Sequence, residues 1–189
     1  ATTAARLSSA GIGPSSSHTV GPMRAARDFA ARLDDVGELD LVARVRCVLF
    51  GSLGATGLGH GTPDAIVAGL RGLTPEACAP DDVREAWTAY PEGAPLELAG
   101  RHPIPFVRDD IVFEPRTRLP AHPNAMTLEA SDAAGALIRA ETYYSVGGGF
   151  IRREGEAASV ARHPFPYAYR DAAELLELCD EHGLTIAEL

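Results

Sequence analysis

The spacing of apolar residues near the start of the chain predicts a helix. Between Val20 and Asp34, apolar positions recur every three to four residues, while Arg24 and Arg27 lie largely on the opposite face. Thr19 is the preferred N-cap, because its hydroxyl can accept a bond from a free N–H of the first turn. Gly37 is a suitable residue to end the helix.

Four later segments show patterns typical of strands. Arg44–Phe50 alternates, with Val45, Cys47 and Leu49 on one face, and predicts a strand. Further strands are predicted for three segments: Ile111–Glu114, Met126–Ser131 and Leu137–Val146, the last two joined by the turn of residues 132–135.

A second helix is predicted to open at Thr62-Pro63-Asp64, with Thr62 as N-cap and proline at the first helical position. It is expected to end at Gly69 or Gly72. Residues 73–110 are rich in proline and acidic side chains, and we expect them to be irregular apart from a short helix near Asp82–Thr88.

The C-terminal part predicts one more helix. Asp171 and Glu174 have the spacing of a capping box, and the helix is expected to reach Gly183. Thr185 and Glu188 repeat that spacing directly before the last residue, which favours a natural chain that continues. We therefore expect one domain over residues 1–165, followed by a connecting helix in 166–189 that leads to a domain outside this sequence.

The order of elements defines the expected fold class. A helix–strand–helix unit is followed by three strands, so the order is α-β-α-β-β-β. Such an order suits an α+β fold with two layers and a mixed sheet. The chain has 189 residues, of which 46% are hydrophobic, and this is enough to bury a core.

Charge and hydropathy exclude several function classes. The net charge of −9 argues against nucleic-acid binding, which needs clustered basic residues. No run of about 18 apolar residues is present, so no membrane span is expected. Residues 1–10 lack the apolar segment of a secretory signal. We expect a cytoplasmic protein.

The three cysteines do not form a metal-binding motif. Cys47, Cys78 and Cys179 are far apart, with no C-x-x-C pair. Cys47 lies on the apolar face of its strand, where a free cysteine packs as a small hydrophobe. We expect no metal ligand in this chain.

Two glycine-containing segments carry the candidate chemistry. Residues 11–23 (GIGPSSSHTVGPM) place three serines and His18 before the first helix. Residues 51–62 (GSLGATGLGHGT) place His60 before the second helix. Backbone N–H groups and hydroxyls at helix starts favour an anion. Two such segments with one histidine each indicate a small substrate with a carboxylate and a group that transfers a proton.

These two segments, together with HPNAM at residues 122–126 and TYYSVGGGF at 142–150, resemble bacterial iron–sulfur L-serine dehydratases, also called L-serine ammonia-lyases. The resemblance runs in order from about residue 11 to the C-terminus. It implies the N-terminal, or beta, domain of that enzyme. A domain of similar fold serves as the allosteric substrate-binding domain of some phosphoglycerate dehydrogenases.

The resemblance also implies a reaction and its partners. L-serine would be converted to pyruvate and ammonia by base-assisted elimination at a [4Fe-4S] cluster. That cluster would be bound by the enzyme's own C-terminal domain, which this sequence lacks, and the enzyme is expected to be a homo-oligomer. The rival hypothesis is a regulatory domain that binds a small anion, such as an amino acid, without catalysis.

The candidate site residues follow from the matched segments. His60 is the first choice for the base, because Gly59 and Gly61 leave its ring free to enter a cleft; the alternative is a loop histidine exposed to water. His18 is the second catalytic candidate, or a residue of the helix start. The expected substrate contacts, several of which could instead cap a helix, are Ser16, Ser17, Thr19, Ser52, Gly61, Thr62 and Asn124.

Overall fold

The computed structural model describes residues 15–156, 169 and 171–186. The chain divides into two compact units, residues 1–156 and 157–189. The domain boundary expected at residue 165 and the first four residues of the GIGPSSSHTVGPM segment lie outside the described residues. Within the described part, no helix is both long enough and apolar enough to cross a membrane.

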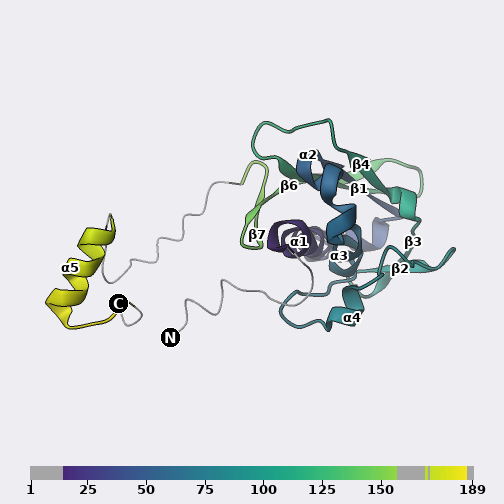
Figure 1. The fold of residues 1–189 in the computed structure, drawn as a ribbon. Coiled ribbons are helices and arrows are strands. Elements are labelled where there is room, and N and C mark those ends of the chain that lie inside the picture. Colours follow the sequence, from purple (N-terminus) through teal and green to yellow (C-terminus); the bar gives the residue numbers. More distant parts are fainter. Residues whose placement is uncertain (1–14, 157–168, 170, 187–189) are drawn as a thin grey trace. The chain divides into compact units, whose positions relative to one another are not determined.

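The first unit is built on a mixed five-stranded sheet with the strand order β4-β1-β5-β6-β7 (Figure 1). The β1–β4 pair is parallel and the other neighbours are antiparallel. This confirms the α+β class and the mixed sheet. The strands are β1 (Arg44–Phe50), β4 (Ile111–Glu114), β5 (Asn124–Ser131), β6 (Leu137–Gly147) and β7 (Phe150–Arg153).

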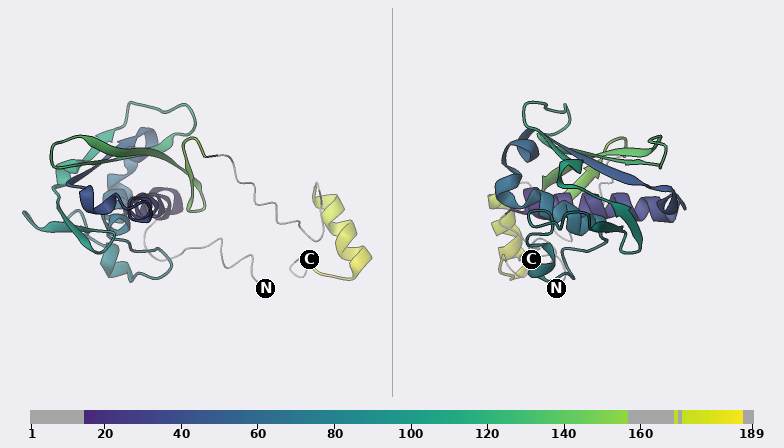
Figure 2. Two further views of the ribbon diagram at one scale, coloured as in Figure 1. Left: turned by 180° about the vertical axis from the view of Figure 1, so that it is seen from behind. Right: turned by 90° about the vertical axis from the view of Figure 1, so that its right-hand side faces the viewer.

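Two helices, α1 (Gly21–Asp35) and α3 (Thr62–Leu70), lie together on one side of this sheet (Figures 1 and 2). Their apolar faces, with Phe29 and Leu33 on α1, join the inward face of β1 in one hydrophobic core. Cys47 is 1% exposed in that core, as its place in the alternating pattern predicted. Burial raises the pKa of its thiol, which keeps it protonated.

Shorter elements connect these helices and strands. They are the π-helical turn η2 (Ser16–Val20), the 3-10 turns η3 (Leu39–Leu41), η4 (Leu58–His60) and η5 (Arg108–Asp110), and the helices α2 (Gly51–Thr56) and α4 (Pro80–Val83).

The expectation that residues 73–110 are irregular was wrong. A two-stranded hairpin forms from β2 (Pro95–Leu98) and β3 (His102–Pro105), and the short helix is α4 rather than residues 82–88. Prolines weaken a strand pattern because they lack the N–H donor, but they are tolerated in a strand at an edge. Here Leu96, Leu98 and Ile104 enter the main core, and their burial favours the hairpin.

Both predicted helix starts differ from the structure. Helical backbone begins at Ser16, and extended backbone is found at Ser15, so Thr19 is not an N-cap. Thr62 is the first helical residue of α3, and Gly61 holds the cap position with a φ of 67°. In both cases the threonine hydroxyl binds a distant carbonyl instead, which a local pattern does not reveal.

The C-terminal unit contains helix α5 (Ala172–His182), as predicted. The Asp171 carboxylate accepts bonds from the backbone N–H groups of Ala173 and Glu174. Gly183 follows the helix with a φ of 62°, the left-handed conformation that glycine favours at a helix end. Glu188, the last residue of the second capping pattern, lies outside the described residues.

Gly69 allows α1 and α3 to approach closely. A Cβ atom at this position would lie 2.2 Å from the Met23 carbonyl oxygen and 3.0 Å from the Ala26 Cβ. Neither group can move without shifting α1 itself. The approach aligns the two helices so that the segments preceding them, η2 and η4, come together.

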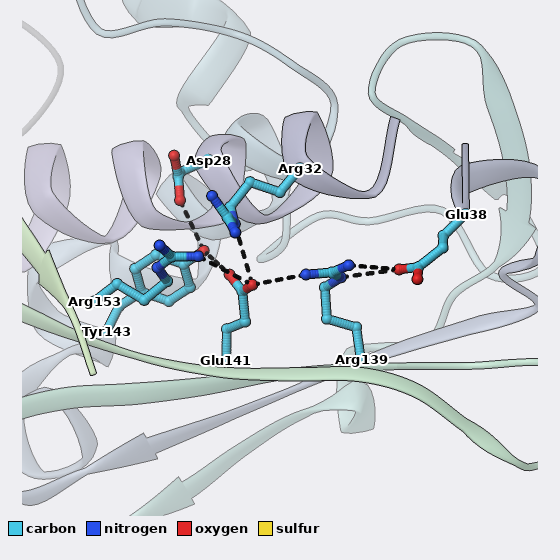
Figure 3. A network of polar contacts seen from close by, with 7 residues as sticks. All are labelled: Asp28, Arg32, Glu38, Arg139, Glu141, Tyr143 and Arg153. Carbon is cyan, nitrogen blue, oxygen red and sulfur yellow. Dashed lines mark hydrogen bonds and ion pairs between the residues drawn. The ribbon is translucent and has the colours of Figure 1, made fainter. Parts of the chain in front are cut away.

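A network of charged side chains connects α1 to β6 and β7 (Figure 3). At its centre, the side chain of Glu141 is 10% exposed. Its oxygens accept bonds from Tyr143, Arg32, Arg139 and Arg153 at 2.6–3.3 Å. The outer members are Glu38, which binds Arg139, and Asp28, whose carboxylate lies 2.9 Å from the Tyr143 hydroxyl and competes with Glu141 for its single proton.

Burial and hydrogen bonding act in opposite directions on Glu141. Burial favours the neutral acid, but the bonds from Tyr143, Arg32 and Arg139 outweigh it and lower the pKa of Glu141 below its ordinary value. Burial and the neighbouring carboxylates raise the pKa of Tyr143, so the phenol remains a donor. The network therefore holds one carboxylate ionised beneath α1.

We predict that Gly69→Ala lowers the free energy of unfolding by about 2–4 kcal/mol, because the added methyl group meets backbone in a close-packed contact. Urea denaturation measures the change. Gly59→Ala is the matched control, since a Cβ there meets nothing within 4 Å, and its stability should be unchanged or slightly higher. Equal stability of both variants would contradict the close approach.

We predict that Glu141→Gln lowers the free energy of unfolding by about 2–4 kcal/mol at pH 7, because it removes a buried carboxylate from three partly buried guanidinium groups. Since folding lowers the pKa of Glu141, its contribution is present above the unfolded-state value of 4.5 and is lost as the pH falls through the folded value.

The difference between wild type and Glu141→Gln should therefore shrink in acid, as measured by urea denaturation across this pH range. Glu129→Gln breaks a surface ion pair with Arg46 and serves as the control, with an expected loss of about 0.5 kcal/mol or less. A pH-independent difference for Glu141→Gln would contradict the assignment of its charge.

Candidate functional site

The structure brings the two candidate histidines side by side. His18 lies in η2 and His60 in η4, and their ring centroids are 4.8 Å apart with an interplanar angle of 40°. The two turns precede α1 and α3, so the helix packing described above places them together. The two histidine segments therefore meet at a single site.

Two threonines connect the histidine segments by reciprocal hydrogen bonds, which we call the threonine clamp. The Thr19 hydroxyl donates to the His60 carbonyl at 3.0 Å, and the Thr62 hydroxyl donates to the His18 carbonyl. Both threonines are buried, with exposures of 1% and 0%. Each bond satisfies a carbonyl in the opposite segment, so the clamp sets the separation of the two backbones.

The His18 ring is hydrogen-bonded at both nitrogens. Nδ1 lies 3.0 Å from the Ser17 hydroxyl, and Nε2 lies 3.2 Å from the Ser52 hydroxyl and 3.1 Å from the Thr56 hydroxyl. Burial lowers the pKa of His18, and the nearby charge of His60 lowers it further, against a smaller opposing effect of the Ser52 backbone. His18 is therefore held as a neutral ring with a fixed orientation.

One ring nitrogen of His60 is hydrogen-bonded to a group of the described residues, and the other is not. Its Nδ1 lies 2.8 Å from the Thr56 carbonyl oxygen. A carbonyl only accepts, so Nδ1 must carry the proton, and the neutral ring then has its lone pair on Nε2. No group of the described residues bonds that Nε2. A half-buried imidazole with an unpaired lone pair can accept a proton from a bound molecule.

The predicted substrate contacts occupy different positions around the histidines. Ser17 and Ser52 contact His18 directly, whereas Ser16 is exposed. Thr19 and Thr62 use their hydroxyl protons in the clamp, so donation to a substrate would break those bonds.

Asn124 begins β5 and forms an isolated bridge with Gly51, the residue before Ser52. Its side-chain amide donates to the Ser145 carbonyl at 3.4 Å. Gly61 adopts a φ of 67°, which allows the chain to turn from His60 into α3.

Ser145 and Thr56 were missed by the sequence analysis. Ser145 is 3% exposed, and its hydroxyl has no hydrogen-bond partner among the described residues, facing Gly21 at the start of α1. Its signal was its place before the glycine run of residues 147–149. Thr56 lies in the matched segment four residues before His60, but only the tertiary structure brings it to His18 as well.

The glycine run lies against the first turn of α1. A Cβ atom at Gly149 would lie 2.6 Å from Val20 Cγ1, and the Gly149 carbonyl accepts a bond from Arg24 at 2.7 Å. Only a residue without a side chain allows this approach at a φ of 77°. The run therefore holds the β6–β7 turn beside the histidine segments.

The donor set of the described residues does not fit an iron–sulfur cluster. They contain no group of three or more His, Cys, Asp or Glu side chains that could hold a metal ion. Cys47 is sealed in the core and Cys78 is only partly exposed in the first unit, while Cys179 belongs to the second.

Comparisons with known proteins show what the chain as a whole is similar to. A family model described as "Serine dehydratase beta chain" matches residues 4–156. "L-serine dehydratase" of Streptomyces coelicolor is 47% identical over 97% of this chain, and that of Mycobacterium bovis is 44% identical over 94%. "L-serine dehydratase 1" of Escherichia coli is 41% identical over 95%. The chain spans only 39–41% of the length of these relatives.

We predict that Thr19→Val and Thr62→Val each lower the free energy of unfolding by about 1–3 kcal/mol, because each leaves a buried carbonyl without its donor. Thr19→Ser and Thr62→Ser keep the hydroxyl and serve as controls, for which we expect smaller losses of unfolding free energy. Because both bonds join the same two segments, the double valine variant should not show the simple sum. Urea denaturation measures all variants, and unchanged stability of Thr62→Val would exclude the clamp.

Proposed function

The chain belongs to the serine dehydratase beta-chain family, and on this premise we propose that it is the substrate-binding and proton-abstracting part of an L-serine ammonia-lyase. The observation that carries the proposal is the pairing of two histidine rings, of which only His60 has a ring nitrogen without a hydrogen-bond partner among the described residues. The relatives named L-serine dehydratase support L-serine as the substrate.

The proposed reaction begins with removal of the Cα proton of L-serine. His60 Nε2 accepts this proton, and the hydroxyl group at Cβ leaves as the Cα–Cβ double bond forms. The product of this loss of water is aminoacrylate, whose imine form reacts with water to give pyruvate and ammonia. A positioned base of this kind contributes roughly 10²–10⁴-fold to the rate.

His18 has a different role in this scheme. Both of its nitrogens are already hydrogen-bonded to serine and threonine hydroxyls, so taking up a proton would require a bond to break. Burial also lowers its pKa and disfavours the cation. We propose that His18 orients the hydroxyls of Ser17 and Ser52 toward the substrate.

The carboxylate of the substrate would be held near the first turn of α1. Ser16 and Ser17 lie in η2, directly before that turn. Ser52 contacts His18 of η2, and Asn124 is connected to the residue before Ser52 through the Gly51 bridge. Ser145 adds a buried hydroxyl with no partner in the described structure. These groups are neutral donors, which suit a small zwitterion better than a strongly charged anion.

We propose that the [4Fe-4S] cluster belongs to the part of the longer relatives that this chain does not span. The donor set described above supports this division, because this chain supplies histidines and hydroxyls and no thiolate group at the site. The rival proposal is a regulatory domain that binds an amino acid without turnover. It requires the same hydroxyl and amide groups to bind the ligand, but no base.

A chimaera tests the proposal. This chain replaces the corresponding part of the Streptomyces coelicolor relative, and pyruvate release from L-serine is measured. His60→Ala should lower kcat by about 10²-fold or more, because the Cα proton then has no acceptor.

His102→Ala is the matched control. His102 also has a ring nitrogen at hydrogen-bond distance from a backbone carbonyl, that of Val42, but it lies in β3, outside both histidine segments. Its kcat should match that of the unmodified chimaera. Turnover of His60→Ala at the control rate would remove His60 from the mechanism, and L-serine binding without any turnover would favour the regulatory alternative.

A further inference from the structure

Thr56 lies between the two histidines and contacts both of them. It is the last residue of α2, the short helix that follows β1. Its hydroxyl is 3.1 Å from His18 Nε2, and its carbonyl oxygen is 2.8 Å from His60 Nδ1. One residue therefore offers a separate polar group to each ring.

The Thr56 hydroxyl has a single proton, and the partner that receives it decides whether Thr56 donates to His18 or accepts from it. The Thr56 hydroxyl also lies 3.0 Å from the Ser52 carbonyl oxygen, one helical turn earlier. That carbonyl can only accept, so the single hydroxyl proton is committed to it. His18 then donates from Nε2 toward the Thr56 hydroxyl oxygen, and the Ser52 hydroxyl oxygen, 3.2 Å from the same nitrogen, accepts from it as well. The neutral ring keeps its lone pair on Nδ1, where the Ser17 hydroxyl donates.

The carbonyl of Thr56 selects the opposite state in His60. It accepts from Nδ1–H, so the lone pair is on Nε2. A histidine that is free in water favours the other tautomer, with the proton on Nε2. The contact with Thr56 therefore changes which nitrogen of His60 is available as a base.

We propose that Thr56 is a positioning residue that sets the two histidines in opposite tautomers, His18 protonated at Nε2 and His60 protonated at Nδ1. Its relevance to catalysis rests on the proposed function, in which His60 is the base and His18 orients the hydroxyls of Ser17 and Ser52. The tautomers themselves are a property of this chain and can be measured without turnover.

The test uses the ¹⁵N-labelled 189-residue chain at mildly alkaline pH. Long-range ¹H–¹⁵N spectra of the histidine side chains distinguish a protonated ring nitrogen from a bare one. In the wild type, we expect the protonated nitrogen to be Nε2 in His18 and Nδ1 in His60. A wild-type His60 that carries its proton on Nε2 would overturn the proposal before any variant is made.

Thr56→Val removes the hydroxyl and retains the carbonyl. The two ring nitrogens of His18 should then move toward each other in ¹⁵N shift as both tautomers become populated, whereas His60 should keep its wild-type shifts. Thr56→Ser restores the hydroxyl and should restore the His18 spectrum. Unchanged His18 shifts in Thr56→Val, or equal changes in the valine and serine variants, would overturn the proposal.

The chimaera described above separates this inference from the proposed function. If it turns over L-serine, Thr56→Val should lower kcat more than it changes KM, and Thr56→Ser should recover most of the loss. An inactive His60→Ala together with fully active Thr56→Val would contradict the positioning role while leaving the base in place. Opposite tautomers in an inactive chimaera would support the role of Thr56 and count against the lyase.

Discussion

The close contact between α1 and α3 at Gly69 is the constraint on which the rest of the first unit depends. The Met23 carbonyl occupies the space that a side chain at position 69 would need. Because each helix begins directly after a histidine-containing turn, the distance between the helices also sets the distance between His18 and His60. Packing in the core thus determines geometry at the site.

The threonine clamp converts this approximate proximity into a defined arrangement. Apolar packing is not directional, whereas a hydroxyl that donates to a buried carbonyl restricts both distance and angle. Thr19 and Thr62 are buried and each binds the backbone beside the opposite histidine. The site therefore combines a rigid backbone frame with rings whose tautomers are selected by a third segment, at Thr56.

The charged network around Glu141 stabilises the same helix at a different place. It joins α1 to β6 and β7 through Arg32, Tyr143 and Arg153, on the strand pair that also carries the glycine run. Ionised side chains beneath a helix are costly to bury unless they are paired. Here three guanidinium groups and a phenol satisfy one carboxylate, so α1 is held against the sheet by directional bonds as well as by its apolar face.

The sequence by itself determined the elements whose signal is local. The bounds of β1 and β4, the helix after Asp171 and the burial of Cys47 all follow from alternation, capping or hydropathy within a few residues. The two histidine segments were also recognisable as candidates for the functional site, from their composition and their resemblance to a known family. The β2–β3 hairpin was missed, because its prolines and charged residues obscure the strand pattern. Its stability comes from contacts of Leu96, Leu98 and Ile104 with the main core, which are not local in sequence.

The tertiary structure alone decided how the candidate residues act. A threonine before a helix has the same sequence signature whether it caps the helix or donates to a carbonyl more than forty positions away, as Thr19 and Thr62 do. Likewise, nothing near Thr56 indicates two imidazole neighbours. Hydrogen bonds between residues distant in the sequence depend on how the helices pack. The spacing of apolar residues predicts which face of an element is buried, but not which residues that face contacts.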